Sequence, residues 1–314
     1  MDRDARVYVA GHAGLAGSAI WRGLRDAGFG DLAGATSAEV DLRDRPAAFD
    51  LVGSIRPDVA VIAAARVGGI AANAAYPAEF LSDNLRIQVN VMDAAHAFGV
   101  ERLLFLGSSC IYPKSAEQPI RESSLLTGVL EPTNDAYAIA KIAGIMQVQA
   151  HRRQYGARWI SAMPTNLYGP GDNFHPENSH VLPALIRRFH EAVEQGRDEV
   201  VLWGSGTPRR EFLHVDDLGR AVVHLLDVYD DPETINVGVG DDVTIRELAE
   251  TVAGVVGFGG AIVQDPSRPD GTPRKVLDVS RIRALGWEPR IALRDGIEST
   301  YRWFVEHRAE ARLG

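Results

Sequence analysis

The chain has a single cysteine, Cys110, among its 314 residues. One cysteine excludes an internal disulfide and a zinc site built from several cysteines, and we predict no metal site. No apolar run reaches the roughly 20 residues that a membrane-spanning helix requires. No basic segment followed by an apolar stretch opens the sequence. We therefore expect a cytoplasmic protein with no membrane partner.

Positive charge is also in short supply. The chain carries 33 Lys and Arg against 42 Asp and Glu, which gives a formal net charge of -9. This balance argues against nucleic acid as a partner, although a local basic cluster could still hold a small anion. A chain of 314 residues can bury the core of one large or two small domains.

Apolar runs alternate with helical patterns along most of the chain. The runs at 6–10, 59–64 and 102–106 are almost continuously apolar, as expected for strands covered on both faces of a parallel sheet. The pattern predicts helices at 18–27, 45–55, 77–98, 136–155, 181–195, 245–256 and 293 to about 310, and weaker strands at 200–203 and 234–237. Asp216 is expected to cap a helix that runs to Tyr229.

This order predicts an α/β protein with a doubly wound parallel sheet of the Rossmann type and a smaller α/β C-terminal substrate domain. We expect residues 1–167 and 213–240 to form the dinucleotide-binding domain, and residues 168–212 and 241–314 the substrate domain. The helix at 77–98 has more apolar positions than one buried stripe needs. It either packs on another subunit or lies deeply buried within one, and the sequence does not separate the two.

A glycine turn follows the first predicted strand. Gly11, Gly14 and Gly17 open the first helix, so that backbone amides and the helix N-terminus can approach a pyrophosphate. The alternative is a simple tight turn. A site for NAD usually has an acidic residue after the second strand and a site for NADP an arginine, but residues 34–38 supply neither. Asp41 could face the adenine; equally, Asp41 and Asp44 could cap the helix that begins at Arg45.

Tyr137 and Lys141 stand four positions apart, on one face of a predicted helix. A nearby ammonium favours phenolate, so we expect Lys141 to lower the pKa of Tyr137. Ser108 follows a predicted strand, where ligands bind in open parallel sheets. If the backbone stays extended, Ser108 and Cys110 point to the same side. The set predicts oxidation or reduction at a sugar or alcohol carbon. The alternative for Tyr137 and Lys141 is an exposed pair on a helix surface, and the alternative for Ser108 is a simple turn.

With the glycine turn, this set resembles the short-chain dehydrogenase/reductase family. Longer segments narrow the resemblance, over nearly the whole chain, to the GDP-L-fucose synthase group of its extended branch. The segments with this resemblance are Gly-Ser-Ser-Cys-Ile-Tyr-Pro at 107–113, Glu-Pro-Thr-Asn at 131–134, 163–169, 172–176, 178–181, 203–208 and 210–217. The resemblance implies 3,5-epimerisation and NADPH-dependent 4-keto reduction of GDP-4-keto-6-deoxy-D-mannose. It also implies a homodimer built on the helices at 77–98 and 136–155.

Residue roles follow from the same resemblance. Tyr137 would donate a proton to the keto oxygen, Lys141 would assist it on the nicotinamide ribose, and Ser108 would bind the same oxygen. Cys110 and His180 would be the base and acid of epimerisation, since thiol and imidazole both titrate near neutrality. The implied GDP-sugar contacts are Ser108, Asn166, Arg188, Trp203, Arg210, Asp270 and Lys275. The implied cofactor contacts are Gly11, His12, Ala13, Gly14, Leu15, Ala16, Gly17, Asp41, Leu106, Gly107, Ser108, Ser109, Tyr137, Lys141, Pro164, Thr165, Asn166, Leu167 and His180.

One departure from the family pattern concerns the cofactor. The family commonly has arginine where this chain has Ala13, and again around Ala35 and Ser37, to hold the 2'-phosphate of NADPH. NADP(H) is therefore the cofactor implied by resemblance, and NAD(H) remains open. Two other functions remain open as well: action on another GDP-4-keto sugar, such as a deoxyheptose, and a nucleotide-sensing homologue without turnover.

Overall fold

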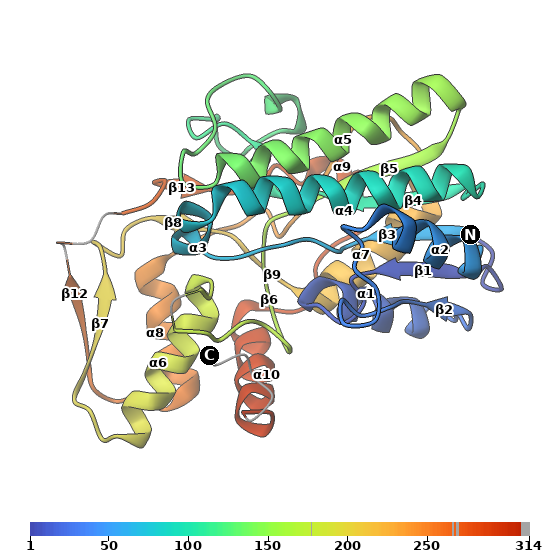
Figure 1. Cartoon of the computed structure of the whole chain (residues 1–314). Coiled ribbons are helices and arrows are strands. Elements are labelled where there is room, and N and C mark those ends of the chain that lie inside the picture. Colours follow the sequence, from blue (N-terminus) through green and yellow to red (C-terminus); the bar gives the residue numbers. More distant parts are fainter. Residues whose placement is uncertain (177, 266, 268–269, 309–314) are drawn as a thin grey trace.

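The structure, a computed structural model, describes residues 1–176, 178–265, 267 and 270–308. A six-stranded parallel sheet forms its centre, in the order β10-β5-β4-β3-β1-β2 (Figure 1). Its strands are β1 (Val7–Ala10), β2 (Leu32–Ala33), β3 (Val59–Ile62), β4 (Arg102–Leu106), β5 (Arg158–Pro164) and β10 (Ile235–Val237). Every residue of β1, β3 and β4 is buried, because the sheet is covered on both faces. The doubly wound parallel sheet predicted from the sequence is confirmed.

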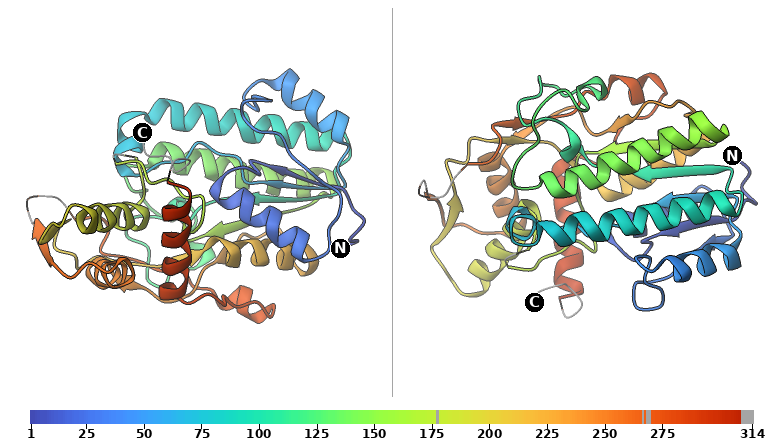
Figure 2. Two further views of the ribbon diagram at one scale, coloured as in Figure 1. Left: turned by 90° about the horizontal axis from the view of Figure 1, so that it is seen from below. Right: turned by 45° about the horizontal axis from the view of Figure 1, so that its top comes forward.

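Helices form a layer on each face of this sheet, as the two views of Figure 2 show. One layer holds α1 (Leu15–Asp26) and α7 (Val215–Val228), and the other holds α2 (Arg45–Ile55), α4 (Pro77–Ala97) and α5 (Asp135–Tyr155). Glycine allows α1 and α7 to pack backbone to backbone. A Cβ on Gly219 would lie 2.4 Å from the carbonyl oxygen of Ala19. A short helix, α3 (Ile70–Ala75), precedes α4, and α9 (Ser280–Ala284) packs beside β10.

A second hydrophobic core lies in the part of the molecule that holds α6 (Val181–Glu194), α8 (Ile245–Val256) and α10 (Leu293–Glu306). Beside these helices, β7 (Glu199–Trp203) pairs with β12 (Ala261–Asp265). A three-stranded sheet joins β11 (Val243–Thr244), β8 (Arg209–Arg210) and β13 (Arg274–Lys275), and β6 (Asn166–Tyr168) pairs with β9 (Phe212–His214). Late residues of the chain return to the first core, since Leu277 and Ile282 are buried in it. The exact division into two domains stays a prediction.

The start of α7 corrects one prediction. His214, not Asp216, caps this helix, because His214 Nδ1 accepts a hydrogen bond from the Asp216 amide at 3.2 Å. The Asp216 carboxylate lies in the first turn and pairs with Arg22 instead. At α2 the structure favours the capping alternative for Asp44, which accepts a hydrogen bond from Ala47 N. A short strand, β6, follows β5, and residues 309–310 of the last predicted helix lie outside the described residues.

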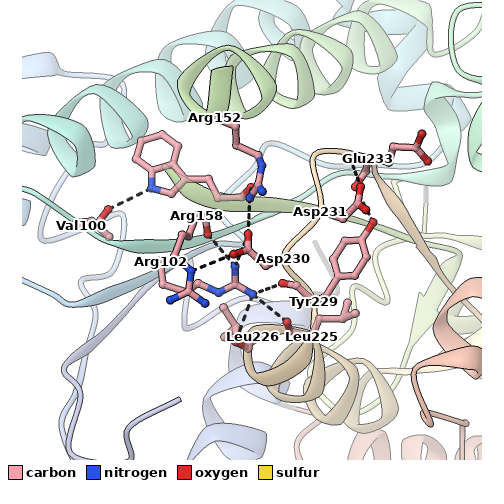
Figure 3. A network of polar contacts seen from close by, with 11 residues as sticks. Val100, Arg102, Arg152, Arg158, Leu225, Leu226, Tyr229, Asp230, Asp231 and Glu233 are labelled. Carbon is pink, nitrogen blue, oxygen red and sulfur yellow. Dashed lines mark hydrogen bonds and ion pairs between the residues drawn. The ribbon is translucent and has the colours of Figure 1, made fainter. Parts of the chain in front are cut away.

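A buried arginine on the sheet forms hydrogen bonds with the C-terminal end of α7 (Figure 3). Arg102, at the start of β4, donates to the carbonyl oxygens of Leu225 at 3.1 Å, Leu226 at 3.3 Å and Tyr229, and to Arg158 O at 2.8 Å. Burial lowers the pKa of Arg102 to about 10, yet the guanidinium satisfies the carbonyls that a helix leaves unpaired at its C-terminus.

Candidate active site and dinucleotide site

The glycine turn between β1 and α1 has the backbone shape that a dinucleotide needs. Gly11 has a φ of 82°, and a Cβ on Gly17 would lie 2.0 Å from the carbonyl oxygen of Gly11. Gly14 precedes α1 without any side-chain cap, so the first amides of that helix are left for an anion. The residues therefore fit a pyrophosphate at this position.

Two acidic side chains in the segment after β2 make local contacts. Thr36 donates from its amide and its hydroxyl to Glu39 Oε2, both at 2.8 Å, and these hydrogen bonds hold the pKa of Glu39 below its usual range. Asp41 is held by Arg43, with 2.9 Å between Nη2 and Oδ2. Glu39 was not singled out from the sequence, although it stands about 20 residues after the glycine turn, where an acid can bind the adenosine ribose in sites of this type.

Several predicted cofactor residues lie at the carboxyl-terminal edge of the sheet. Leu106 and Ala162 pair at the carboxyl ends of β4 and β5. Gly107 continues that contact by donating to Ala162 O at 2.9 Å. The segment 164–167 continues from β5 along the same edge, where open parallel sheets bind their ligands.

Ser108, Cys110 and Tyr137 lie together beyond β4. Ser108 begins a short 3-10 helix (Ser109–Ile111), and its Oγ accepts a hydrogen bond from Cys110 N at 3.2 Å. The Ser108 hydroxyl also lies near the side chains of Tyr137 and Cys110 and acts to lower the pKa of both. The backbone thus turns after Ser108 and does not stay extended. Ser108 and Cys110 therefore lie together because the backbone turns between them, and not because alternate residues of a strand point to the same side.

Lys141 lies one helical turn after Tyr137 on α5 and is buried. Its Nζ donates to the carbonyl oxygen of Leu106 at 2.9 Å and lies 5.9 Å from the centre of the Tyr137 ring. Burial lowers the pKa of Lys141 to about 7, and burial together with the nearby Cys110 raises the pKa of Tyr137. The prediction that Lys141 lowers the pKa of Tyr137 is therefore wrong for the chain alone, because removal from water dominates for both groups.

The Cys110 thiol has a cation beside it. Lys275 Nζ lies 3.5 Å from Cys110 Sγ. Burial works against the thiolate, but Lys275, together with hydrogen bonds from Ser108 and Asn134, holds the pKa of Cys110 below its usual value. Asn134 was not singled out from the sequence, although it belongs to the segment 131–134.

His180 precedes α6 at the position of its N-cap. His180 is exposed as a residue, yet the protein packed around its ring and the charge of Lys275 lower its pKa. Gly69, ahead of α3, donates to Asn178 O at 3.2 Å, and a Cβ on Gly69 would lie 2.8 Å from Ser179 O. The loop that carries His180 therefore packs against backbone from the nucleotide-binding side.

The predicted GDP-sugar residues come from several elements. Asn166 donates to Glu211 O at 2.7 Å, and the Asp270 carboxylate accepts from the amide and hydroxyl of Ser205 at 2.9 and 2.7 Å. Arg188 donates to Val201 O and lines a surface hollow of about 690 Å³. Burial lowers the pKa of Arg210, while Trp203 is 62% exposed. Cationic and flat aromatic side chains are thus present for a nucleotide, and the roles of these residues stay predictions.

None of the helices in the described part of the chain combines the length and apolar character needed to span a bilayer. Within the same residues, no three His, Cys, Asp or Glu side chains gather where a metal ion could bind.

A Rossmann sheet, a glycine turn, a serine beyond β4 and a tyrosine–lysine pair on the next helix define an extended short-chain dehydrogenase/reductase. The chain belongs to the NAD dependent epimerase/dehydratase family, and the sequence model of that family matches residues 7–238. It is 58% identical to a putative GDP-L-fucose synthase 2 of Arabidopsis thaliana, over 98% of this chain and 94% of that protein. It is 54% identical to the GDP-L-fucose synthase of Escherichia coli (strain K12), over 98% of both. A crystal structure of a GDP-L-fucose synthetase from Naegleria fowleri bound to NADP superposes with a TM-score of 0.91 at 29% identity, over 99% of this chain and 97% of that one.

Proposed function

We propose that the chain converts GDP-4-keto-6-deoxy-D-mannose to GDP-L-fucose by epimerisation at C3 and C5 and reduction at C4, with NADP(H) as cofactor. The observation that carries the proposal is the cluster of Ser108, Cys110 and Tyr137 beyond β4, with Lys141 behind it. The similarity to GDP-L-fucose synthases over nearly the full length of the chain supports the choice of substrate.

Epimerisation needs acidic C–H bonds and a base. The hydrogens on C3 and C5 flank the C4 ketone, and donors at the ketone oxygen stabilise the enolate that forms when one is removed. Ser108 and Tyr137 are the donors in this proposal, and the Cys110 thiolate is the base. His180 lies on the neighbouring loop and returns a proton on the other face of the ring, which inverts the carbon.

Reduction uses the same oxygen site. NADPH, when bound along the glycine turn and the carboxyl ends of β1, β4 and β5, supplies the hydride to C4. Tyr137 gives its proton to the C4 oxygen. Burial raises the pKa of this phenol, so Tyr137 holds its proton at neutral pH, as a donor must. Lys141 occupies the position behind Tyr137 from which an ammonium can bind the nicotinamide ribose.

The nucleotide half of the substrate is assigned to the C-terminal part of the chain. Arg188 and Arg210 offer charge-assisted hydrogen bonds to the pyrophosphate, and Trp203 offers an exposed ring face. Asn166 and Asp270 complete the assignment, the latter through the loop that it ties to Ser205. The domain boundaries at 167, 212 and 240 belong to the same proposal.

We also propose a homodimer built on α4 and α5. Val89 on α4 is 37% exposed, and Ile139 and Met146, seven positions apart on α5, are 46% and 40% exposed. Their exposure in a single chain favours the subunit contact over the deeply buried helix, the two alternatives that the sequence left open. A cytoplasmic location fits the proposed base, because a reducing compartment keeps the Cys110 thiol free.

The test follows both activities in one tube. The chain is incubated in D2O with GDP-4-keto-6-deoxy-D-mannose and NADPH, and oxidation of NADPH and deuterium at C3 and C5 of the product are measured. We expect GDP-L-fucose labelled at both carbons. Tyr137→Phe should abolish reduction, keep dinucleotide binding and leave exchange at C3 and C5 measurable.

Two results would count against the proposal. Absence of NADPH and NADH oxidation with this substrate would remove the reductase function and leave a nucleotide-sensing role. Faster turnover of a GDP-4-keto-heptose in a mixture of both sugars would reassign the substrate.

A further inference from the structure

Lysine is rare in this chain. Only Lys114, Lys141 and Lys275 are lysines among 33 basic residues, so arginine meets nearly every other need for positive charge. Lys141 and Lys275 both lie at the proposed active site. An ammonium is a compact point charge that can sit directly against one atom, whereas a guanidinium spreads its charge over a planar fork. The choice of lysine at position 275 therefore suits contact with a single sulfur atom.

The backbone around Lys275 is anchored on both sides. Lys275 pairs with Arg210 in the register between β13 and β8, and its carbonyl oxygen accepts from Glu211 N at 3.3 Å. The next residue, Val276, exchanges hydrogen bonds with the segment 118–120: its amide donates to Gln118 Oε1 at 2.9 Å, and its carbonyl oxygen accepts from Ile120 N at 2.8 Å. Lys275 thus lies on a strand whose backbone is held by β8 and, one residue later, by the segment 118–120.

A buried carboxylate strengthens this anchoring. Glu211 is fully buried and accepts from Val239 N at 2.6 Å, Gly240 N at 2.7 Å and Leu277 N at 2.9 Å. Three amides from two separate segments converge on one side chain. The backbone path that brings Lys275 Nζ to 3.5 Å from Cys110 Sγ is therefore fixed by groups that touch neither atom.

Few other charges act on this pair. Tyr137, from α5, is the titratable neighbour of Cys110, while Ser108 and Asn134 are neutral hydrogen-bonding partners. Lys275 also acts on His180, on the loop before α6. Among the residues that the structure describes, no carboxylate lies within ion-pair distance of Lys275 Nζ. The Lys275 ammonium therefore acts on the Cys110 sulfur and the His180 imidazole, the two groups proposed to exchange protons with the sugar.

We propose that Lys275 is the positioning residue of epimerisation: its ammonium holds Cys110 as the thiolate that removes the proton from the sugar. The proton moves from carbon to sulfur, the electron pair of the C–H bond forms the C=C bond of the enolate, and the π pair of the C4 carbonyl moves to its oxygen. Lys275 neither gains nor loses a proton in this step. This inference rests on the proposed function for the step itself, but the charge state of the thiol can be measured without substrate.

The experiment uses the single cysteine of the chain. The rate of alkylation of Cys110 by iodoacetamide is measured from pH 5.5 to 10 in the wild type, Lys275→Met, Lys275→Arg and Lys114→Met. Lys114 is the matched control, because its ammonium pairs with Glu131 at 3.1 Å. We expect Lys275→Met to slow alkylation at pH 7 by at least about 10-fold and to move the profile to higher pH, since thiolate fraction falls about tenfold for each pKa unit. Lys275→Arg should recover part of the rate, and Lys114→Met should match the wild type.

A second measurement keeps the proposal testable if Lys275→Met does not fold. The 13Cε signal of Lys275 in the intact wild type should change in the pH range where Cys110 titrates, and Cys110→Ser should remove that change.

A third measurement uses the substrate and a folded Lys275→Met variant. With GDP-4-keto-6-deoxy-D-mannose, the pH profile of deuterium exchange at C3 and C5 should shift to higher pH in Lys275→Met. Identical alkylation profiles in Lys275→Met and the wild type, or an unchanged Lys275 signal, would overturn the proposal whether or not the substrate is the right one.

Discussion

Replacing Lys141 by methionine should make the cofactor-free chain more stable, by an amount that depends on pH. Burial takes the pKa of Lys141 from an ordinary value of 10.5 to about 7 in the folded chain. The difference corresponds to about 5 kcal/mol at about 1.4 kcal/mol per pKa unit, as an upper limit on the cost of burying the ammonium. Methionine has a similar length and no charge, and its main loss is the hydrogen bond to Leu106 O, which costs about 1–3 kcal/mol.

The sign of the pH dependence follows from proton binding. Below pH 7 the folded and unfolded chains both carry a proton on Lys141, and the wild type bears the full cost of the buried charge. Between the folded pKa of about 7 and the unfolded value, the unfolded chain binds one more proton than the folded chain, so the stability contributed by this group rises with pH. The advantage of Lys141→Met should therefore shrink by about 3 kcal/mol between pH 6 and pH 9.

Urea unfolding of both proteins at pH 6, 7.5 and 9 measures this difference. Lys114→Met serves as the control, because Lys114 is half exposed and its removal should leave no comparable pH dependence. A difference between Lys141→Met and the wild type that stays constant from pH 6 to 9 would refute the reasoning. The same variant should lose most 4-keto reduction, since stability and function compete at a site that buries an ionisable group.

Three further predictions concern the cofactor site and the fold. Gly17→Ala should weaken NADPH binding at least about 100-fold, measured by fluorescence titration, because its Cβ would lie 2.0 Å from Gly11 O and displace the turn. Arg102→Met should lower the free energy of unfolding by about 3 kcal/mol in urea, because it leaves buried carbonyl oxygens unpaired. Calorimetry should find 2',5'-ADP binding within about 10-fold of 5'-ADP, because Ala13, Ala35 and Ser37 stand where arginines would discriminate.

Matched variants exist for the first two of these predictions. Gly30→Ala adds a Cβ where nothing lies within 4 Å, so it should bind NADPH like the wild type. Arg121→Met removes an arginine whose side chain is 76% exposed, and it should change stability by less than about 0.5 kcal/mol. Equal NADPH affinity in both glycine variants, equal stability in both arginine variants, or a preference above about 100-fold for 2',5'-ADP would each contradict the corresponding argument.

Local sequence patterns predicted most of the fold. Helix α2 and helix α8 have the predicted bounds and α4 ends one residue early, because apolar periodicity and breakers are properties of neighbouring residues. The cap of α7 was predicted incorrectly for a related reason. Asp216 is the commoner capping residue type, but His214 occupies the position, with its other ring nitrogen 3.2 Å from Ser299 Oγ. That contact joins residues 85 positions apart, which no local pattern reveals.

Contacts between residues far apart in the sequence matter even more at the site, and local patterns do not predict them. The i, i+4 spacing placed Tyr137 and Lys141 side by side, and that is a local property of a helix. The direction of the pKa shift of Tyr137 was predicted incorrectly, because it depends on how much protein surrounds the phenol. The cation beside Cys110 comes from a residue 165 positions away, and the sequence offered Lys275 only as a nucleotide contact.

The two proposed reactions depend on different parts of the chain. Reduction draws its protein groups, Ser108, Tyr137 and Lys141, from β4 and α5 of one sheet-and-helix unit. Epimerisation needs the thiol of that unit and two groups delivered from elsewhere, His180 before α6 and Lys275 on β13. A movement of the C-terminal part would therefore act on the charge state of the thiol first, and on Tyr137 through the thiol. Epimerisation should accordingly be the more sensitive of the two reactions to changes at Glu211, whose carboxylate accepts hydrogen bonds from the backbone after β13 and from the loop after β10.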